Sequence, residues 1–487
     1  MLTDLLLQKL ERDAPLPKNR QLYLLLRELI LDGTLRAGNR LPTTRELAKD
    51  LGLSRNTVMY AFEQLLAEGY VTARTGSGTY VADTRPEDSM RAEGSAKSAG
   101  GGPGVGRLSA RGARLVGQAG ALSVQWGAFV PGVPDVTAFP YRTWTRIQNK
   151  VWRRPGPQWL TYGQSGGHEP LRVALADYLK VARSVDCEPG QIVITHGIHQ
   201  AIDLILCMLS DPGDTAWIEE PGYWGIRNLL NTSGLAVRAI PVDDEGLNPQ
   251  PDDWNAPPRL VFVTPSHQYP TGAVMSLARR RALLEMARQH DAWVVEDDYD
   301  SEFRYGGRPL ASLQGLDTAG RVLYVGTFSK TVFPSMRMGY LVLPKPLVEP
   351  FRVALSELYR AGHQLEQAIL ADFIAEGHFV AHIRRMRLLY GERRERLLDG
   401  IRSELGEGRV LSHDSQAGLH LVLKLDGDDR AATEAARRAG LVVRPLSQYY
   451  QDAARARPGL LLGYAGVPEK EIMPALQKLI GAIGADR

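Results

Sequence analysis

The chain has few cysteines, little net charge and no long apolar run. Only Cys187 and Cys207 occur among 487 residues, which excludes a disulfide framework and a zinc site built on four thiolates. Both cysteines lie in apolar surroundings, so we expect buried free thiols. The longest apolar run, around residues 201–209, is far shorter than the roughly 18 to 20 residues of a membrane-spanning helix. The N-terminus lacks a basic start and a small-residue cleavage site, so no secretory signal is predicted.

The remaining composition is that of a large folded protein. With 44% hydrophobic and 23% charged residues and a mean hydropathy of −0.21, the chain is neither wholly disordered, collagenous nor a polytopic membrane protein. The net charge of +3 arises from 58 basic and 55 acidic residues, so any contact with nucleic acid must be a local surface. We expect a soluble protein of the reducing cytoplasm, without a metal site.

One stretch differs from the rest in composition. Residues 84–115 contain six glycines between Gly94 and Gly106, with serine, alanine, proline and charged residues around them. Such a segment cannot bury enough apolar surface to offset its ordering entropy. The sequence therefore predicts a domain at 1–83, a flexible linker at 84–119 and a second domain at 120–487.

The first domain begins with two predicted helices. Leucine and isoleucine residues recur at helical spacing over residues 19–35, and Gly33 is expected to end that helix. Thr43 followed three residues later by Glu46 is a capping-box pattern, which predicts a short helix over residues 44–51.

A third helix and a hairpin follow. Ser54 is the expected N-cap of a helix over residues 55–68, whose apolar positions share one face. Residues 70–73 and 79–81 flank a small glycine-containing tip, which predicts a strand–turn–strand hairpin. Three helices followed by a hairpin are the layout of a winged helix–turn–helix, a mainly α-helical domain.

Polar residues lie where such a domain meets DNA. Arg55, Asn56 and Thr57 begin the expected recognition helix, and Arg45 begins the preceding helix, where it would face phosphate. Gly76 would let the hairpin backbone approach the duplex closely. The alternative is that these side chains are the solvated surface of an ordinary small helical domain.

The stretches LPTTRELAKDLGLSRNTV and EQLLAEGYV resemble the N-terminal domain of the GntR superfamily of transcription regulators. This resemblance implies binding to double-stranded DNA. The positions that correspond to the family's DNA-contacting residues are Arg45, Ser54, Arg55, Asn56, Thr57 and Gly76.

The second domain alternates strand-like apolar runs with helical stretches, which predicts an α/β fold with a mostly parallel sheet. Ligands of such sheets bind at the carboxyl ends of the strands. One predicted strand, residues 322–325, runs into the segment GTFSK, whose Lys330 amine would be partly desolvated and nucleophilic at a pocket floor. The hydroxyls of Thr327 and Ser329 could hold a phosphate, and Arg337 supplies a fixed positive charge.

An acidic run, WVVEDDYDSEF at residues 293–303, ends another predicted strand. Strand alternation places Asp297 and Tyr299 on one side and Glu296 and Asp298 on the other. A buried carboxylate that pairs with a cationic ring nitrogen is what pyridoxal phosphate requires, and a neighbouring tyrosine can bind its phenolic oxygen. A solvated acidic face and a magnesium site are the alternatives for this run.

Two more loops follow predicted strands. Residues 195–200 open a helix whose backbone amides can bind an anion. Residues 219–223 place Tyr223 at a strand end, where its ring can stack on a pyridine ring. The histidines of the first loop could equally be ordinary residues at a helix terminus.

The motifs GIHQ, EPGYWG, PSHQYPTG, EDDYDSEF and GTFSK make residues 120–487 similar to fold-type I aminotransferases, which also have a smaller C-terminal α+β subdomain. The resemblance implies that Lys330 binds pyridoxal phosphate as a Schiff base, that Asp297 pairs with the pyridine nitrogen and Tyr299 with the phenolic oxygen, and that Tyr223 stacks on the ring. It implies that Arg457 binds a substrate carboxylate. The implied phosphate ligands are Gly197, Ile198, Thr327, Ser329 and Arg337.

One loop departs from the free-standing enzymes, which usually carry an asparagine that contacts the phenolic oxygen. Here His267 and Gln268 occupy that loop, and either is a candidate substitute. The same SHQYP-type loop, joined by a long linker to a GntR-type head, resembles the MocR-type transcription regulators.

This second resemblance implies a regulator that senses an amino-compound effector, or pyridoxal phosphate itself, through an aldimine at Lys330. It also implies a head-to-tail, domain-swapped homodimer. The alternative is a catalytically active aminotransferase with a fused DNA-binding head.

Overall fold

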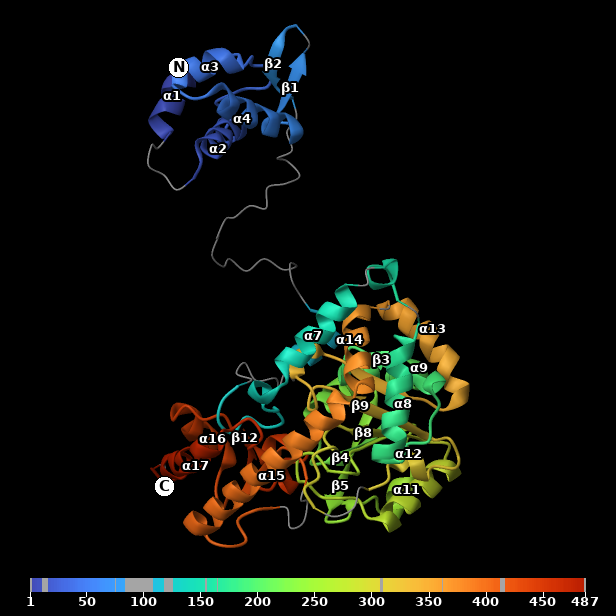
Figure 1. The fold of residues 1–487 in the computed structure, drawn as a ribbon. Helices are drawn as coiled ribbons and strands as arrows, with labels where there is room; N and C mark the ends of the chain where they lie inside the picture. The colour runs from blue at the N-terminus through green and yellow to red at the C-terminus, as the bar shows by residue number, and fades with distance from the viewer. Residues whose placement is uncertain are drawn as a thin grey trace. The chain divides into compact units, whose positions relative to one another are not determined.

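The computed structural model divides the chain into two compact units, Met1–Val105 and Gly106–Arg487, both drawn in Figure 1. Of the predicted linker 84–119, residues 84–107 and 118–119 lie outside the described residues. The structure describes residues 2–10, 16–74, 76–83, 108–117, 126–153, 156–163, 165–306, 310–360, 362–411 and 417–485.

The smaller unit, called the head below, is a helical domain with one hairpin. Its antiparallel strands β1 and β2 pair Val71 with Val81 and Arg74 with Gly78. The three predicted helices and the hairpin are confirmed, and the pattern did not predict the first helix, whose Leu6 is fully buried. The elements are α1 (Leu2–Lys9), α2 (Lys18–Leu31), α3 (Thr44–Leu51), α4 (Arg55–Ala67), β1 (Val71–Arg74) and β2 (Gly78–Val81).

Local hydrogen bonds explain where the head helices begin. The Glu46 amide donates to Thr43 Oγ1 at 3.2 Å, and the Thr43 amide donates to Glu46 Oε2 at 2.9 Å, so the predicted capping box is present. The Thr57 amide donates to Ser54 Oγ at 3.2 Å, which caps α4. These caps hold the two helices of the helix–turn–helix at fixed starting points.

The larger unit is built on an eight-stranded sheet of order β3-β10-β9-β8-β7-β4-β5-β6. The run β9-β8-β7-β4-β5 is parallel, whereas β10 and β6 pair antiparallel to their neighbours, so the sheet is mostly parallel as predicted. The strands are β3 (Ile192–Thr195), β4 (Thr215–Glu220), β5 (Ala236–Asp243), β6 (Gly246–Leu247), β7 (Leu260–Val263), β8 (Trp293–Asp298), β9 (Val322–Thr327) and β10 (Gly339–Val342).

Helices cover both faces of this sheet, which explains its continuous apolar strands. Residues of α9, α10 and α13 form one core with one face of the sheet, and residues of α8, α14 and α11 pack on the other. The helices are α6 (Ala110–Gly117), α7 (Tyr141–Trp152), α8 (Glu169–Arg183), α9 (Ile198–Leu209), α10 (Trp224–Ser233), α11 (Leu277–Gln289), α12 (Leu313–Leu316), α13 (Val348–Tyr359) and α14 (Gln364–Ala375).

The C-terminal part forms the predicted smaller α+β subdomain, in orange and red in Figure 1. Its three strands pair antiparallel in the order β11-β13-β12. The elements are α15 (His378–Leu405), β11 (His420–Lys424), α16 (Asp429–Arg438), β12 (Arg444–Pro445), β13 (Gly459–Gly463) and α17 (Glu469–Ala485).

Two local features differ from the expectations. Helix α6 forms inside the segment predicted as linker. Cys207 is exposed and Cys187 is only half-buried, so the prediction of two buried thiols is wrong. On α9, Cys207 lies four residues after Asp203 and shares its outward face, while Leu204, Leu206 and their neighbours face the core.

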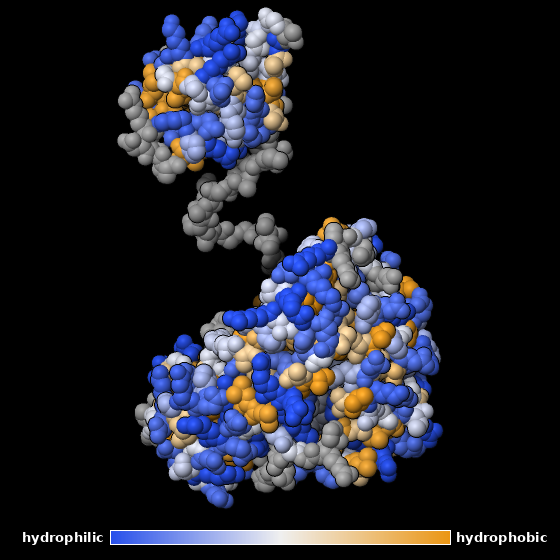
Figure 2. Space-filling view, in the orientation of Figure 1, coloured by the Kyte–Doolittle hydropathy of each residue, from blue (hydrophilic) through white to orange (hydrophobic). Residues whose placement is uncertain are grey.

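The visible surface of the larger unit is mostly hydrophilic, with hydrophobic residues in scattered spots (Figure 2). Among the described residues, no helix combines the length and the apolar character that crossing a membrane requires.

Candidate functional site

The candidate residues of the larger unit gather at the carboxyl ends of neighbouring strands. Asp297 is the next-to-last residue of β8, Lys330 follows β9, and Gly197 follows β3. The loop with His267 follows β7, and Tyr223 follows β4. Because parallel strands end at one edge of a sheet, residues more than 130 positions apart meet there.

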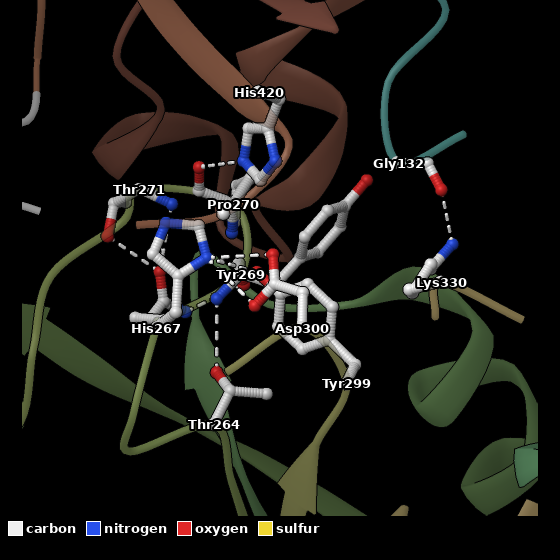
Figure 3. Close-up of polar contacts among 12 residues, drawn as sticks. Gly132, Thr264, His267, Tyr269, Pro270, Thr271, Tyr299, Asp300, Lys330 and His420 are labelled. Carbon is white, nitrogen blue, oxygen red and sulfur yellow. Dashed lines mark hydrogen bonds and ion pairs between the residues drawn. The ribbon is translucent and has the colours of Figure 1, made fainter. Parts of the chain in front are cut away.

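Lys330 lies in the floor of this site. Its Nζ donates a hydrogen bond to the carbonyl oxygen of Gly132 at 2.6 Å (Figure 3). Burial lowers the pKa of Lys330, while the charges of Asp300 and Asp297 oppose that shift. A lysine with a lowered pKa carries more of the neutral, nucleophilic amine at neutral pH.

The acidic strand β8 sends its carboxylates to opposite sides. Glu296 accepts hydrogen bonds from the amides of Leu313 and Gln314, both at 2.9 Å. Asp298 pairs with Arg183 at 2.7 Å, and both side chains are buried. The buried run is therefore neither a solvated face nor, among the described residues, part of a cluster that could hold a metal.

Asp297 differs from these neighbours. It is buried, yet its Oδ1 has no hydrogen-bond partner among the described residues. Burial, with the nearby charge of Asp298, raises the pKa of Asp297 well above its ordinary value. An orphaned buried carboxylate oxygen is costly, and a cationic ring nitrogen would satisfy it.

Tyr299, His267 and Asp300 form a buried polar cluster beside the lysine (Figure 3). The hydroxyl of Tyr299 lies 2.8 Å from His267 Nδ1, and the same nitrogen lies 3.1 Å from Asp300 Oδ2. His267 is 3% exposed and Asp300 is 1% exposed, so neither group is solvated.

The side chain of Gln268 forms hydrogen bonds that stabilise its own loop. Its Nε2 donates to the carbonyl of Pro221 at 2.8 Å, and its Oε1 accepts from the amide of Thr271 at 3.0 Å. Its Nε2 also donates to Glu219, which accepts from Thr264 as well. Of the two candidates in this loop, it is His267 that contacts Tyr299.

Tyr223 packs among aromatic groups at the end of β4. His199 Nε2 lies 3.2 Å from its hydroxyl, and Tyr269 meets its ring edge-on with centroids 5.8 Å apart. The hydroxyls of Tyr269 and Tyr449 are 3.0 Å apart, which ties this wall to the C-terminal subdomain.

Three of the predicted phosphate ligands, Gly197, Ile198 and Arg337, lie around the start of α9. Gly197 has φ +82°, and a Cβ there would lie 3.6 Å from the guanidinium of Arg337. The Thr327 hydroxyl accepts from the Ser329 amide at 3.1 Å, which orients the turn after β9. Ile198 is the first residue of α9, so backbone amides and a guanidinium face one small volume.

Arg457 lies in the loop just before β13 of the C-terminal subdomain. It is exposed and, with Tyr450, Glu220 and Thr271, lines a cavity of about 950 Å³. The lining of this cavity includes neither Lys330 nor Asp297. Glu220 and Thr271 of the same lining lie within three residues of Tyr223 and Gln268 in the sequence.

Sequence reasoning missed two buried polar side chains near the site, those of Arg444 and His420. Arg444 is 8% exposed and its guanidinium lies over the Trp224 ring at 5.6 Å. His420 is 4% exposed and its Nε2 contacts the Pro270 carbonyl at 2.9 Å. A single polar residue within an apolar run, as in LVVRPL and LHLVL, was the available signal.

The candidate DNA-contacting residues lie on the surface of the head. Arg45, Ser54, Arg55, Asn56 and Gly76 are exposed, and Thr57 is partly exposed. The opposite face of α4 is buried through Val58, Ala61, Phe62 and Leu65. Gly76 has φ +75°, a conformation that favours glycine at the tip of the hairpin.

Comparisons with known families match both units. Residues 18–81 match the model of bacterial regulatory proteins of the gntR family, and residues 139–479 match that of class I and II aminotransferases. The chain is 42% identical over 476 residues to the probable rhizopine catabolism regulatory protein MocR of Rhizobium meliloti, covering 97% of this chain and 95% of that protein. It is 32% identical to the pyridoxine biosynthesis transcriptional regulator PdxR of Corynebacterium glutamicum, with 94% of each chain covered.

Solved structures resemble the larger unit. The kynurenine aminotransferase of Pyrococcus horikoshii, in a complex with PMP, has a TM-score of 0.68 at 27% identity and covers 75% of this chain and 92% of its own. The α-aminoadipate aminotransferase LysN of Thermus thermophilus, complexed with a phosphopyridoxyl-leucine, has a TM-score of 0.66 at 25% identity and covers 73% and 92%.

Proposed function

Since the chain belongs to the MocR-type family of pyridoxal phosphate-dependent transcriptional regulators, which join a GntR-type DNA-binding head to an aminotransferase-like domain, we propose that it senses an amino compound at Lys330. The observation that carries this proposal is the buried Asp297 carboxylate, whose Oδ1 lacks a partner among the described residues and whose charge reaches Lys330. We keep 1–83, 84–119 and 120–487 as the proposed boundaries of head, linker and sensing domain.

The residues at the strand ends fit pyridoxal phosphate. When bound, the cofactor supplies an aldehyde that condenses with amines and a ring that withdraws electrons. We assign Lys330 to the aldehyde, Asp297 to the ring nitrogen, Tyr299 to the phenolic oxygen and Tyr223 to the ring face. The proposed phosphate ligands are Gly197, Ile198, Thr327, Ser329 and Arg337.

The chain's own groups support a sensing role for the lysine. The lowered pKa of Lys330 favours the neutral amine that bonds to an aldehyde. If an outside amine took its place on the cofactor, Lys330 would have a hydrogen-bond acceptor in the Gly132 carbonyl. In the sequence, Gly132 lies between the predicted linker and α7. The hydrogen bond from the released Lys330 to Gly132 is therefore the contact through which we propose that the release affects the linker. For an effector with a carboxylate, Arg457 remains our predicted ligand.

The head binds double-stranded DNA, as its family does, and the contacts proposed for it are Arg45, Ser54, Arg55, Asn56, Thr57 and Gly76. We propose a domain-swapped homodimer that acts in the cytoplasm, where its DNA target lies. Mixing a Lys330→Ala chain with an Arg55→Ala chain tests the swap. If each head responds to the partner's cofactor domain, the heterodimer keeps a measurable response, and a complete loss of response contradicts the swapped arrangement.

Replacing the lysine tests the proposal most simply. In Lys330→Ala, we expect that amines no longer change the affinity for the DNA upstream of the chain's own gene. In the wild-type protein, the change should be roughly 5- to 150-fold, because allosteric couplings typically amount to about 1–3 kcal/mol. The matched control is Lys345→Ala, an exposed lysine of the same unit that pairs with Glu188. An unchanged response in Lys330→Ala would refute the sensing role.

Two further assays separate the alternatives. An active aminotransferase with a fused head would transfer amino groups to a keto acid over many turnovers, whereas a sensor should stop after binding or a half-reaction. A sensor of pyridoxal phosphate itself would change its DNA affinity when titrated with the cofactor alone.

A further inference from the structure

One nitrogen of His267 lies within hydrogen-bond distance of two different groups. Its Nδ1 is 2.8 Å from the Tyr299 hydroxyl and 3.1 Å from Asp300 Oδ2. An imidazole nitrogen either carries a proton and donates it, or lacks one and accepts. An ionised carboxylate only accepts.

Nδ1 therefore cannot donate to Asp300 and accept from Tyr299 at the same time. If Nδ1 carries the proton, it donates to Asp300 and cannot accept the proton of Tyr299. If Nδ1 is bare, it accepts from Tyr299 and leaves Asp300 without that donor. The state of His267 decides whether the Tyr299 hydroxyl proton is available to a third group.

The imidazole is held where this choice matters. A Cβ on Gly418 would lie 2.0 Å from the His267 ring, so the backbone at Gly418 leaves little space behind it. The centroid of the His420 ring lies 5.6 Å from that of the His267 ring, and the hydrogen bond to the Pro270 carbonyl holds the His420 ring in place. The ring therefore has little freedom to turn away from Tyr299 and Asp300. Figure 3 shows His267 beside Asp300 and His420.

We propose that His267 and Asp300 act as a positioning pair: His267 commits its Nδ1 proton to Asp300, which leaves the Tyr299 hydroxyl free to donate to the phenolic oxygen of the cofactor. This inference rests on the proposed function, because it concerns the cofactor at Lys330. It gives Asp300, a residue of the EDDYDSEF motif to which the sequence analysis assigned no role, a part in how the cofactor is held.

The charges around the pair are consistent with this arrangement. The charge of Asp300 opposes the lowering of the Lys330 pKa more strongly than the charge of Asp297 does. The pair of His267 and Asp300 is therefore close enough to Lys330 to act on it electrostatically. The titratable and charged groups that face Asp300, His267 or Lys330 are Tyr269, Asp297, Tyr299, Glu302, Tyr305, Arg337, His420 and Tyr464.

A double-mutant cycle on the cofactor-loaded full chain tests the pair, with the pH midpoint of the cofactor's absorbance change as the readout. In the wild-type background, Tyr299→Phe should raise the midpoint by about one to two pH units, since a hydrogen bond to an ionised oxygen is worth about that much. In the Asp300→Asn background, a bare His267 Nδ1 accepts the hydrogen bond of the Tyr299 hydroxyl, so Tyr299→Phe should leave the midpoint unchanged. Asp300→Glu should restore the effect.

The control is Asp429→Asn, a buried carboxylate of the C-terminal subdomain that accepts from Ser447 and Gly459. In that background, Tyr299→Phe should keep its full effect. An undiminished effect in Asp300→Asn would overturn the proposal. A wild-type protein whose absorbance shows no cofactor bound at Lys330 would instead refute the proposed function.

A second measurement needs no substitution at Asp300. In the loaded wild-type protein with ¹⁵N-labelled histidines, the signal that disappears in His267→Gln should report a protonated Nδ1. A bare Nδ1 in the loaded protein would contradict the assignment.

Discussion

The buried pair of Arg183 and Asp298 offers a quantitative test of how the floor of the site is held. Arg183 Nε donates to Asp298 at 2.7 Å, and the side chains are 5% and 2% exposed. The guanidinium also donates to the Ser266 hydroxyl at 2.7 Å and to the Leu310 carbonyl at 2.9 Å. Burial alone would lower the pKa of Arg183, but the charge of Asp298 raises it above its ordinary value.

Arg183→Met keeps much of the side-chain volume but leaves Asp298 as an uncompensated buried charge. Breaking such a pair costs about 3–5 kcal/mol of unfolding free energy. Ser266 and Asp298 are the chain neighbours of His267 and Asp297, so we also expect the affinity for pyridoxal phosphate to fall by about tenfold or more, which corresponds to 1.4 kcal/mol.

Urea unfolding followed by tryptophan fluorescence measures the loss, because all eight tryptophans lie in the larger unit. Two variants make the reasoning refutable. Arg183→Met/Asp298→Asn should recover part of the stability, since it removes the unpaired charge. Arg288→Met, in an exposed pair with Glu285, should leave the unfolding midpoint unchanged. A cost for Arg183→Met no larger than that of the exposed control, or no recovery in the double variant, would contradict the account.

Three further predictions concern other parts of the chain. Burial lowers the pKa of His382 to about 4, so its stabilising contribution is present above pH 6.5 and lost as the pH falls. By pH 5 the lost contribution of His382 to the unfolding free energy amounts to about 2 kcal/mol. The unfolding free energy of His382→Gln, measured in urea titrations, should therefore fall by about that much less between neutral pH and pH 5. Arg55→Ala should cost about 1–3 kcal/mol at one base position, whereas Arg45→Ala should weaken all sequences alike and reduce the salt slope by about one, as binding isotherms would show. Gly418→Ala should destabilise the larger unit by about 1–3 kcal/mol and loosen the cofactor, because its Cβ would overlap the imidazole of the positioning pair. Gly408→Ala, with nearly the same φ but open space, isolates the backbone strain in the same unfolding assay.

Much of the fold follows from signals that are local in sequence. The capping pattern of Thr43 and Glu46 predicted the start of α3, and the period of two in β8 predicted that Asp297 and Asp298 face opposite sides. Both depend on residues only a few positions apart, so a single sequence contains them.

The missed features depend on pairings across the fold. Arg183 and Asp298 are 115 residues apart, and His267 and Asp300 are 33 apart. No pattern within one segment indicates which carboxylate meets which basic side chain. Helix α1 and the exposed side of Cys207 were missed for a related reason, since burial depends on which neighbouring helix packs on a face.

The most direct test of the central claim follows two signals in one titration. Amines and amino acids are added to the cofactor-loaded protein with labelled DNA from its own upstream region, while cofactor absorbance and DNA anisotropy are recorded together. The account predicts that, for an active effector, both signals change with the same midpoint in the wild-type protein, and that the anisotropy of Lys330→Ala does not respond. An equal anisotropy response in Lys330→Ala, or a change in DNA affinity without any change at the cofactor, would contradict it.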